Sequence, residues 1–194
     1  MQSGRANPAL FWSVITTVVL LDIATKILAV YALVPQRIPH EIIGDTVRLT
    51  LVYNPGAAFG LHVGPYSRWI FMALTLGALS ILWRLYKATR EGDLGRTLAL
   101  ALVCGGAVGN LIDRVRSSAG VVDFIDIGVG DMRWPTFNIA DMAVSIGACM
   151  LAYVLWGEDK GLASGTDSSE DSDDISSIPG NRVAMSATGP ASEI

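Results

Sequence analysis

Four long apolar segments determine what this chain can fold into. They cover approximately residues 11–34, 66–86, 94–112 and 137–156. A helix needs about 20 predominantly apolar residues to cross the hydrocarbon core of a bilayer, and each segment comes close to that length. A cleavable signal peptide has a shorter apolar core, so we interpret the first segment as a retained helix. The sequence therefore predicts an all-α polytopic membrane protein with four transmembrane helices.

The composition agrees with a membrane protein and argues against several soluble classes. Charged residues make up 16% of the chain, whereas an ordinary soluble domain contains about 25%. Residues 157–194 contain eight acidic and two basic residues and carry a charge of −6, whereas residues 1–156 carry +2, which gives the net charge of −4. Nucleic acid is not an expected partner, because no basic domain is present. We predict a membrane domain over residues 1–156 and a disordered acidic tail over 157–194.

Positive charges indicate how the four segments are oriented. The basic residues around the connection between the second and third segments are Arg84, Lys87, Arg90 and Arg96. Positive charge marks the cytoplasmic side of a membrane protein. With four spans, both termini are then cytoplasmic, and residues 35–65 and 113–136 lie outside.

The first external segment contains one pattern typical of a strand. Apolar and polar residues alternate from Val47 to Tyr53, and Asn54-Pro55-Gly56 then interrupts the pattern. Residues 57–60 are small or apolar and would form a rim. We expect a small β-cradle on the extracytoplasmic membrane surface.

Two charged residues interrupt the first apolar segment. Asp22 and Lys26 are four residues apart, which places them on one helix face where they can form an ion pair. A charge inside the membrane costs several kcal/mol unless it has a partner. An internal pair explains both residues, and contact with a polar ligand group or with the external segment is the alternative.

The pattern Asn-x-x-Asp occurs twice, once near the outer end of each of the last two segments. The copies are Asn110 with Asp113, and Asn138 with Asp141. In each copy the amide and the carboxylate share a helix face. Asp141 has no basic residue within one helical turn, so its partner must come from elsewhere in the fold. Two facing copies would form a polar site near the outer surface.

Two further carboxylates, Asp123 and Asp126, are flanked by large apolar residues. Desolvation should raise the pKa of both groups. Two carboxyl groups close together cannot both ionise, and such a pair can hydrolyse an amide without a metal or a covalent nucleophile. His40 and His62 are far apart and form no common zinc motif, and no GxSxG motif occurs. A small proton-coupled membrane carrier or binding protein that uses the same carboxylates is the competing class.

Five motifs together resemble bacterial lipoprotein signal peptidase, which is signal peptidase II. They occur in order between about residues 10 and 156. The motifs are Leu21–Lys26, Asn54–Gly60, Gly105–Arg114, Val121–Phe124 and Phe137–Asp141. The acidic tail has no counterpart in the family pattern.

The resemblance implies a catalytic pair consisting of Asp123 and Asp141. Asp113 competes for the first role, but Arg114 adjoins it and should hold it ionised, so we prefer Asp123. Asn54, Gly56, Asn110, Arg114, Asn138 and Ala140 would then line the substrate groove. The substrate-binding or supporting residues as a whole are Asp22, Lys26, Asn54, Gly56, Gly106, Asn110, Asp113, Arg114, Asn138 and Ala140.

The resemblance also implies the activity and the location. It implies an intramembrane aspartic endopeptidase that removes the signal peptide from diacylglyceryl-modified prolipoproteins and cuts before the lipidated cysteine. No cofactor and no metal are expected. The expected partners are the prolipoproteins and membrane lipids, and we expect a monomer. The implied location is the bacterial inner membrane, with the active site near its extracytoplasmic surface.

Overall fold

The computed structural model describes residues 7–56 and 64–170. Four helices in these ranges are long and apolar enough to cross a membrane. They are α1 (Pro8–Ala32), α2 (Ser67–Ala88), α3 (Leu94–Arg116) and the first part of α4 (Ile139–Glu170), as far as Gly157. The prediction of four transmembrane helices is confirmed, with ends shifted by a few residues.

The starts of the helices follow from local capping. The Asn7 side chain accepts a hydrogen bond from the Leu10 N–H (3.1 Å), and Pro8 occupies the first turn, where its missing N–H does no harm. Asp93 accepts in the same way from the Arg96 N–H at the start of α3 (2.9 Å). These caps satisfy backbone donors that the first helical turn leaves unpaired.

A small antiparallel sheet is built from the two segments that connect α1 to α2 and α3 to α4. Its strands are β1 (His40–Ile43), β2 (Val47–Asn54), β3 (Val121–Val129) and β4 (Met132–Arg133), in the order β1-β2-β3-β4. β2 confirms the predicted strand. β3 has no alternating pattern, because its first four residues are all buried, and the sequence pattern therefore did not reveal it. A short 3-10 helix, η2 (Gly64–Tyr66), precedes α2.

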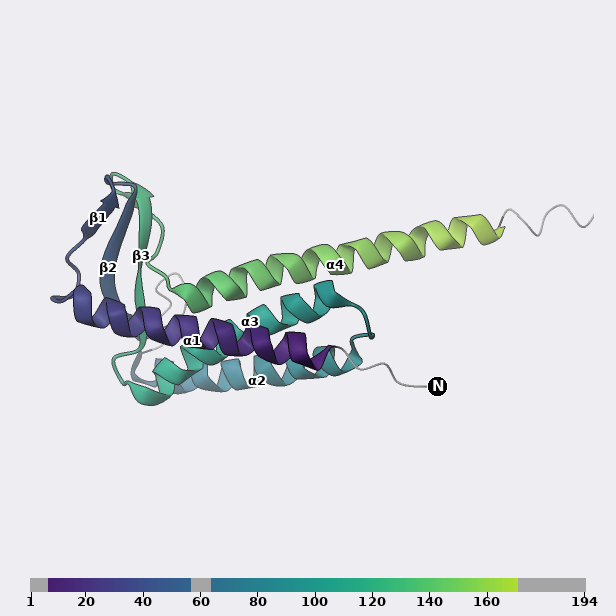
Figure 1. Ribbon diagram of the computed structural model, residues 1–194, viewed down its shortest axis with the longest axis horizontal. Coiled ribbons are helices and arrows are strands. Elements are labelled where there is room, and N and C mark those ends of the chain that lie inside the picture. Colours follow the sequence, from purple (N-terminus) through teal and green to yellow (C-terminus); the bar gives the residue numbers. More distant parts are fainter. Residues whose placement is uncertain (1–6, 57–63, 171–194) are drawn as a thin grey trace, which may run out of the picture. The chain divides into compact units, whose positions relative to one another are not determined.

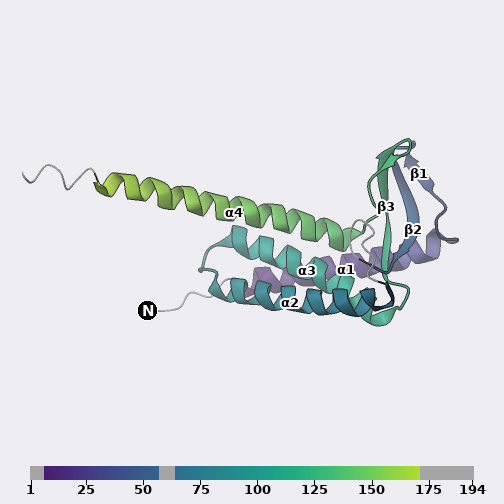
Figure 2. The same ribbon diagram turned by 180° about the vertical axis from the view of Figure 1, so that it is seen from behind.

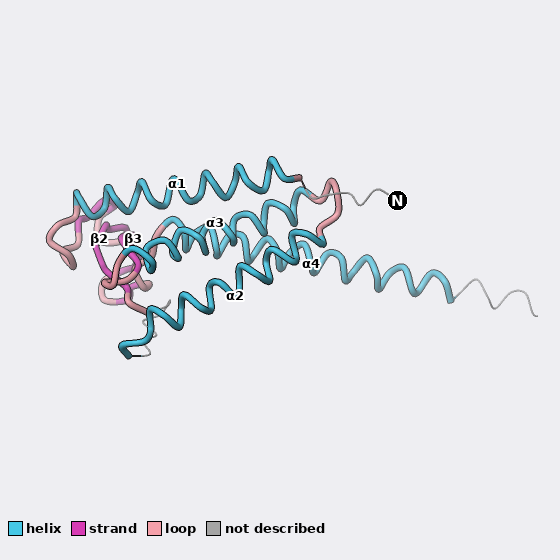
Figure 3. The backbone as a smooth tube through the Cα atoms, turned by 90° about the horizontal axis from the view of Figure 1, so that it is seen from below, coloured by secondary structure: helices cyan, strands magenta, loops and turns pink. Residues whose placement is uncertain are grey.

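The sheet lies at the end of the bundle where α1 and α3 finish and α2 begins (Figure 1, Figure 2). Leu51 of β2 and Phe124 of β3 pack against Ala29 and Leu33 at the end of α1. α1, α2 and α3 run side by side, and α3 contacts both of the others (Figure 3). One end of the helix bundle is therefore tied directly to the sheet.

Small residues let α3 and α4 approach closely. A Cβ atom at Gly106 would overlap the Ala140 carbonyl oxygen, and one at Gly147 would lie 2.8 Å from the Ala99 carbonyl oxygen. Close approach of this kind is the main way in which helices gain contact energy in lipid. Gly106 is therefore a packing residue between two helices.

The opposite end of the bundle is held by aromatic side chains. Phe11 of α1 stacks on Tyr86 of α2 with ring centroids 3.7 Å apart. Trp83 of α2 lies 5.4 Å from the Tyr86 ring and 6.2 Å from the Phe11 ring. No ionisable carboxylate takes part in these ring contacts.

The C-terminal tail differs from the expectation of disorder from residue 157. α4 continues as a helix to Glu170, so residues 157–170 are helical. Extending an existing helix adds one hydrogen bond per residue without a new nucleation cost. This explains why the polar residues after the membrane segment continue the same helix. From Trp156 onward the chain belongs to a separate compact unit. Residues 171–194 lie outside the described residues.

Candidate active site

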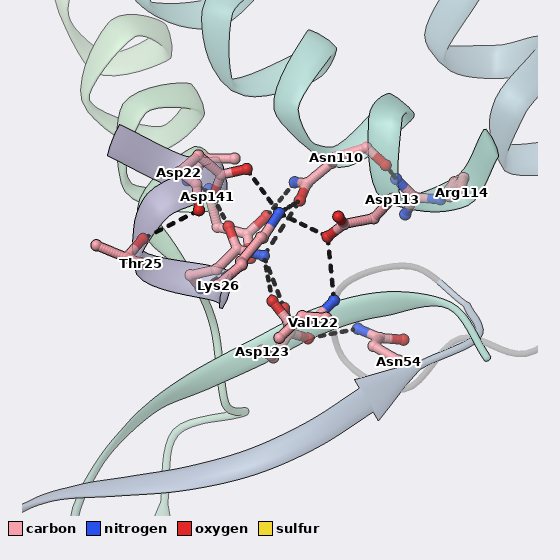
Figure 4. Close-up of polar contacts among 12 residues, drawn as sticks. Asp22, Thr25, Lys26, Asn54, Asn110, Asp113, Arg114, Val122, Asp123 and Asp141 are labelled. Atoms are coloured by element: carbon pink, nitrogen blue, oxygen red, sulfur yellow. Dashed lines mark hydrogen bonds and ion pairs between the residues drawn. The ribbon is translucent and has the colours of Figure 1, made fainter. Parts of the chain in front are cut away.

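A cavity of about 540 Å³ lies where the sheet meets α3 and α4. Its polar residues come from four different elements and from the segment before α4, and Figure 4 shows Asn54, Asn110, Asp123 and Asp141 among them. The polar residues among its lining are Asn54, Asn110, Arg114, Asp123, Thr136, Asp141 and Ser145. Much of the remaining wall is apolar and includes Met142, Val144 and Ile146 of α4.

Asp123 extends from β3 and is 2% exposed. Its two oxygens accept hydrogen bonds from the Asn138 side-chain amide (2.8 Å) and the Asn54 side-chain amide (3.0 Å). Burial, and after it the charge of Asp141, raises the pKa of Asp123 to about 7, although the two amide hydrogen bonds and the charge of Lys26 oppose this rise. The expected direction of its pKa shift is confirmed.

Asp141 lies in the first turn of α4, where it forms a reciprocal cap with Asn138. The Asn138 side-chain oxygen accepts from the Asp141 N–H (2.9 Å), and the Asp141 carboxylate accepts from the Asn138 N–H (3.2 Å). This is the capping-box geometry, with Asn and Asp in place of the usual residues. The other Asp141 oxygen accepts from the Asn110 side-chain amide of α3 (2.7 Å). Asn110 is thus the partner that Asp141 had to find outside its own helix.

Asn138 connects the two carboxylates. Its side chain is fully buried, and its amide nitrogen donates to Asp123 (2.8 Å) and to the Asn110 side-chain oxygen (3.1 Å). The Val122 carbonyl also lies within hydrogen-bond distance of this nitrogen (3.2 Å). The two Asn-x-x-Asp copies therefore meet, as their positions predicted, but only the second copy caps a helix.

Lys26 is the buried cation of the cluster. Its Nζ contacts one oxygen each of Asp22 (2.7 Å), Asp113 (2.8 Å) and Asn110 (3.0 Å). The predicted ion pair of Asp22 and Lys26 is therefore confirmed, and it extends to α3. The second Asp22 oxygen accepts from the Ala140 N–H of α4 (3.0 Å), so this pair connects three helices.

Asp113 is ion-paired, but its partner is Lys26 and not the adjacent Arg114. Neighbouring residues on a helix do not face each other, which is why the expected pairing with Arg114 is wrong. Asp113 also accepts from the Val122 N–H (3.2 Å). Arg114 instead donates to the Gly56 carbonyl (3.1 Å) and to the Asn110 carbonyl (3.2 Å). Asp113 is held outside the cavity, whereas Arg114 lines it.

The expectation that the pKa of Asp126 is raised is wrong. Burial does raise the pKa of Asp126, but the contacts with Arg133 (2.6 Å), Thr50 (2.9 Å) and Arg48 (3.2 Å) outweigh it, and the net pKa is lowered. The alternation of side chains along β3 turns Asp126 away from Asp123, toward these residues of the sheet. Asp126 is therefore a structural anion and not part of the cavity.

Three residues expected to line the groove support it from outside. Gly56, Asn138 and Ala140 are not among the lining residues. The Gly56 carbonyl accepts a hydrogen bond from Arg114, and Ala140 is fully buried against α3. Ser145 also lines the cavity and was not predicted, although its position four residues after Asp141 on the same helix face could have revealed it. Residues 134–136 line the cavity as well, and the sequence contains no comparable pattern that predicts them.

Within residues 7–56 and 64–170, no three His, Cys, Asp or Glu side chains are grouped so that they could hold a metal ion. His62 and residues 57–60 of the predicted rim lie outside these ranges. The reactive groups of the described cavity are thus two carboxyls, three polar side chains of Asn or Arg, and hydroxyls of Thr136 and Ser145.

A polytopic membrane bundle with two acidic side chains in one cavity defines a membrane-embedded protein of the aspartic peptidase class. Residues 14–156 match the family model of signal peptidase (SPase) II, and the chain belongs to this family. The resemblance of the five motifs is thereby confirmed. Because the family is one of peptidases, the carrier alternative is wrong.

Two curated relatives carry the name lipoprotein signal peptidase. That of Halothermothrix orenii is 42% identical over 148 residues, which cover 76% of this chain and 95% of the relative. That of Burkholderia thailandensis is 43% identical over 138 residues, which cover 70% and 81%.

Two solved structures, both described as bacterial membrane enzymes, share the fold. One has a TM-score of 0.73 at 27% identity and covers 83% of this chain and 96% of that one. The other has a TM-score of 0.69 at 28% identity, with coverage of 80% and 97%. The β-cradle and the four helices thus belong to a fold already seen in bacterial membrane enzymes.

Proposed function

We propose that this chain removes the signal peptide from diacylglyceryl-modified prolipoproteins, with Asp123 and Asp141 as its catalytic pair. One observation carries the proposal: both carboxyls line the same cavity and both bind Asn138. An aspartic pair needs two carboxyl groups in one site, and two carboxyls that face one cavity and share an amide partner fit this requirement. The names of the relatives support the substrate class.

The two aspartates would differ in protonation state. A pKa of about 7 makes Asp123 the group that keeps its proton near neutral pH. In a pair of neighbouring carboxyls one keeps its proton and the other acts as the base, so the role of base falls to Asp141. We therefore assign Asp141 as general base and Asp123 as general acid.

The reaction then proceeds in two steps. Asp141 takes a proton from water, the resulting hydroxide attacks the carbonyl carbon that precedes the lipidated cysteine, and Asp123 gives its proton to the carbonyl oxygen. In the second step Asp123 takes a proton back from the diol, the C–N bond breaks, and Asp141 gives its proton to the leaving nitrogen. Both carboxyls return to their starting states, so no cofactor is consumed.

The cavity wall suits a lipidated substrate. Met142, Val144 and Ile146 belong to the membrane-spanning part of α4 and line the cavity beside Asp141. The acyl chains of the substrate can stay in hydrocarbon along this wall while the scissile bond meets the carboxyls. The basic residues Arg84 and Lys87 lie near the end of α2, at the opposite end of the bundle from the sheet. By the positive-inside rule, the cavity then faces the extracytoplasmic side and both termini face the cytoplasm.

The test measures signal-peptide release from a diacylglyceryl-modified substrate peptide by the purified full chain in detergent. Asp123→Asn and Asp141→Asn keep the size of the side chain but cannot transfer the proton. Each variant should lower the turnover rate by about 10²- to 10⁴-fold. Asp131→Asn is the matched control, because Asp131 is an exposed aspartate of the same sheet region and should leave turnover unchanged. Full activity in either catalytic variant would rule out the pair.

A further inference from the structure

A second cavity, which we call the rear cavity, lies on the α1 side of the polar cluster. Its volume is about 370 Å³. Lys26 and Asp113 line it, whereas Asp123 and Asp141 line the first cavity. The buried ion pair of Lys26 and Asp113 therefore has the rear cavity on one side and the catalytic residues on the other. No step of the proposed reaction uses the rear cavity.

One wall of the rear cavity is apolar and lies within the membrane. Ile23, Ile27 and Val30 are spaced by four and three residues, so they share one face of α1. This face belongs to the membrane-spanning segment Pro8–Ala32. Ile27 is 58% exposed in the protein alone, which means that hydrocarbon must cover it. A molecule that fills this part of the cavity must have an apolar chain.

The mouth of the rear cavity contains a cation, Arg116, that has no partner among the residues the structure describes. Arg116 is the last residue of α3 and is exposed. Its guanidinium forms no hydrogen bond or ion pair with any residue in the described part of the chain. Lys26, the other cation that lines the rear cavity, is already paired, because the Asp22 and Asp113 carboxylates bind its ammonium group. The hydroxyl groups of Ser117 and Tyr31 also line the cavity.

We propose that the rear cavity binds one membrane phospholipid, with its phosphate on Arg116 and an acyl chain along the Ile23–Val30 face of α1. A phosphodiester carries one negative charge, which matches the one charge of the Arg116 guanidinium, and arginine can bind two phosphate oxygens at once. An arginine at a helix end reaches the headgroup layer, where lipid phosphates lie. Inorganic phosphate would match the charge but would leave the apolar wall uncovered.

Native mass spectrometry of the full chain, released from detergent that contains phosphatidylglycerol, tests this proposal. The unmodified chain should retain one lipid. Arg116→Gln should weaken this binding about tenfold, the change expected for one charge-assisted contact. Arg90→Gln is the matched control, since Arg90 is an exposed arginine in the connection between α2 and α3. Ile27→Trp places a ring in the cavity and should also weaken binding, without removing any charge.

Two competitors identify the source of the bound group. Diacylglycerol with the same acyl chains should bind about tenfold more weakly because it lacks the phosphate, and inorganic phosphate should not displace the lipid. Equal retention by Arg116→Gln and Arg90→Gln would overturn the proposal, as would displacement by inorganic phosphate. Stoichiometric displacement by a diacylglyceryl peptide would also overturn it, by assigning the cavity to the substrate. Because lipid retention is measured without turnover, its failure would leave the proposed peptidase function untouched.

Discussion

The two ends of the helix bundle are held together by opposite chemistry. At the sheet end, Lys26 of α1 is paired with Asp22 and with Asp113 of α3. At the other end, Phe11 of α1 stacks on Tyr86 of α2. Apolar contacts between helices gain little in lipid, because the lipid tails are equally apolar. A buried charge that loses its partner costs much more. The polar end therefore fixes the relative positions of side chains, and the aromatic end contributes packing.

Removal of the buried cation should have the largest effect on stability. Lys26→Met leaves the Asp22 and Asp113 carboxylates without their cation, and Asp22 is fully buried. We expect the free energy of unfolding to fall by about 3–5 kcal/mol. Reversible unfolding in mixed detergent micelles, followed by circular dichroism, measures this change.

Lys87→Met is the control for the loss of a lysine. Lys87 is exposed on α2 at the aromatic end, where its ammonium lies 5.4 Å from the Trp83 ring. Loss of this cation–π contact should cost about 0.5–1 kcal/mol. If the two variants were equally stable, the polar cluster would not be what holds the sheet end together.

Features that depend on local sequence patterns could be predicted from the sequence. Long apolar segments and the alternation from Val47 to Tyr53 are local patterns, and they predicted the four helices and β2. The ion pair of Asp22 and Lys26 was also predictable, because both residues are one helical turn apart. The aromatic end left no comparable pattern, since Phe11 and Tyr86 come from different helices.

Contacts between distant segments account for what the sequence analysis missed. The partner of Asp113 is Lys26, 87 positions earlier in the chain, whereas sequence adjacency suggested Arg114. Asp123 and Asp126 look alike in sequence, because both are flanked by apolar residues. They differ because Asp126 faces Arg133 and Arg48, whereas Asp123 faces Asn138 and Asn54. The pairing of β3 with β2 and β4, together with the docking of α4, determines these neighbours.

The pH dependence of catalysis tests the chemistry of the polar end. In the proposed mechanism Asp123 must be protonated, and its pKa is about 7. Above this pH the protonated fraction falls, so the rate should decrease about tenfold per pH unit between pH 7.5 and 9. The measurement is kcat/KM for signal-peptide release across this range, with circular dichroism at each pH as the control for folding. A rate that stays constant or rises with pH would exclude Asp123 as the general acid.

A substitution at the aromatic end should have a smaller effect and should leave the chemistry intact. Phe11→Ala removes the ring that stacks on Tyr86 and lies beside Trp12 and Trp83. We expect a loss of about 1 kcal/mol of unfolding free energy, the value of an aromatic pair. The activity per folded molecule should not change, because Phe11 lies at the opposite end of α1 from Lys26. An altered pH profile in this variant would show that the aromatic end and the polar end are coupled, and it would contradict this prediction.

Truncation after Lys160 should have the smallest effect of all. The chain from Trp156 onward forms a unit separate from the one that contains the cavity, and the cavity lining ends at Ile146. The removed residues, 161–194, contribute no described side chain to the polar cluster or to the aromatic end, so neither source of stability is lost. We expect membrane insertion, unfolding free energy and kcat/KM for the lipidated substrate to match those of the full chain. A truncated protein that inserts normally but is inactive would contradict this prediction, and it would mean that the acidic segment acts on substrate or on a partner.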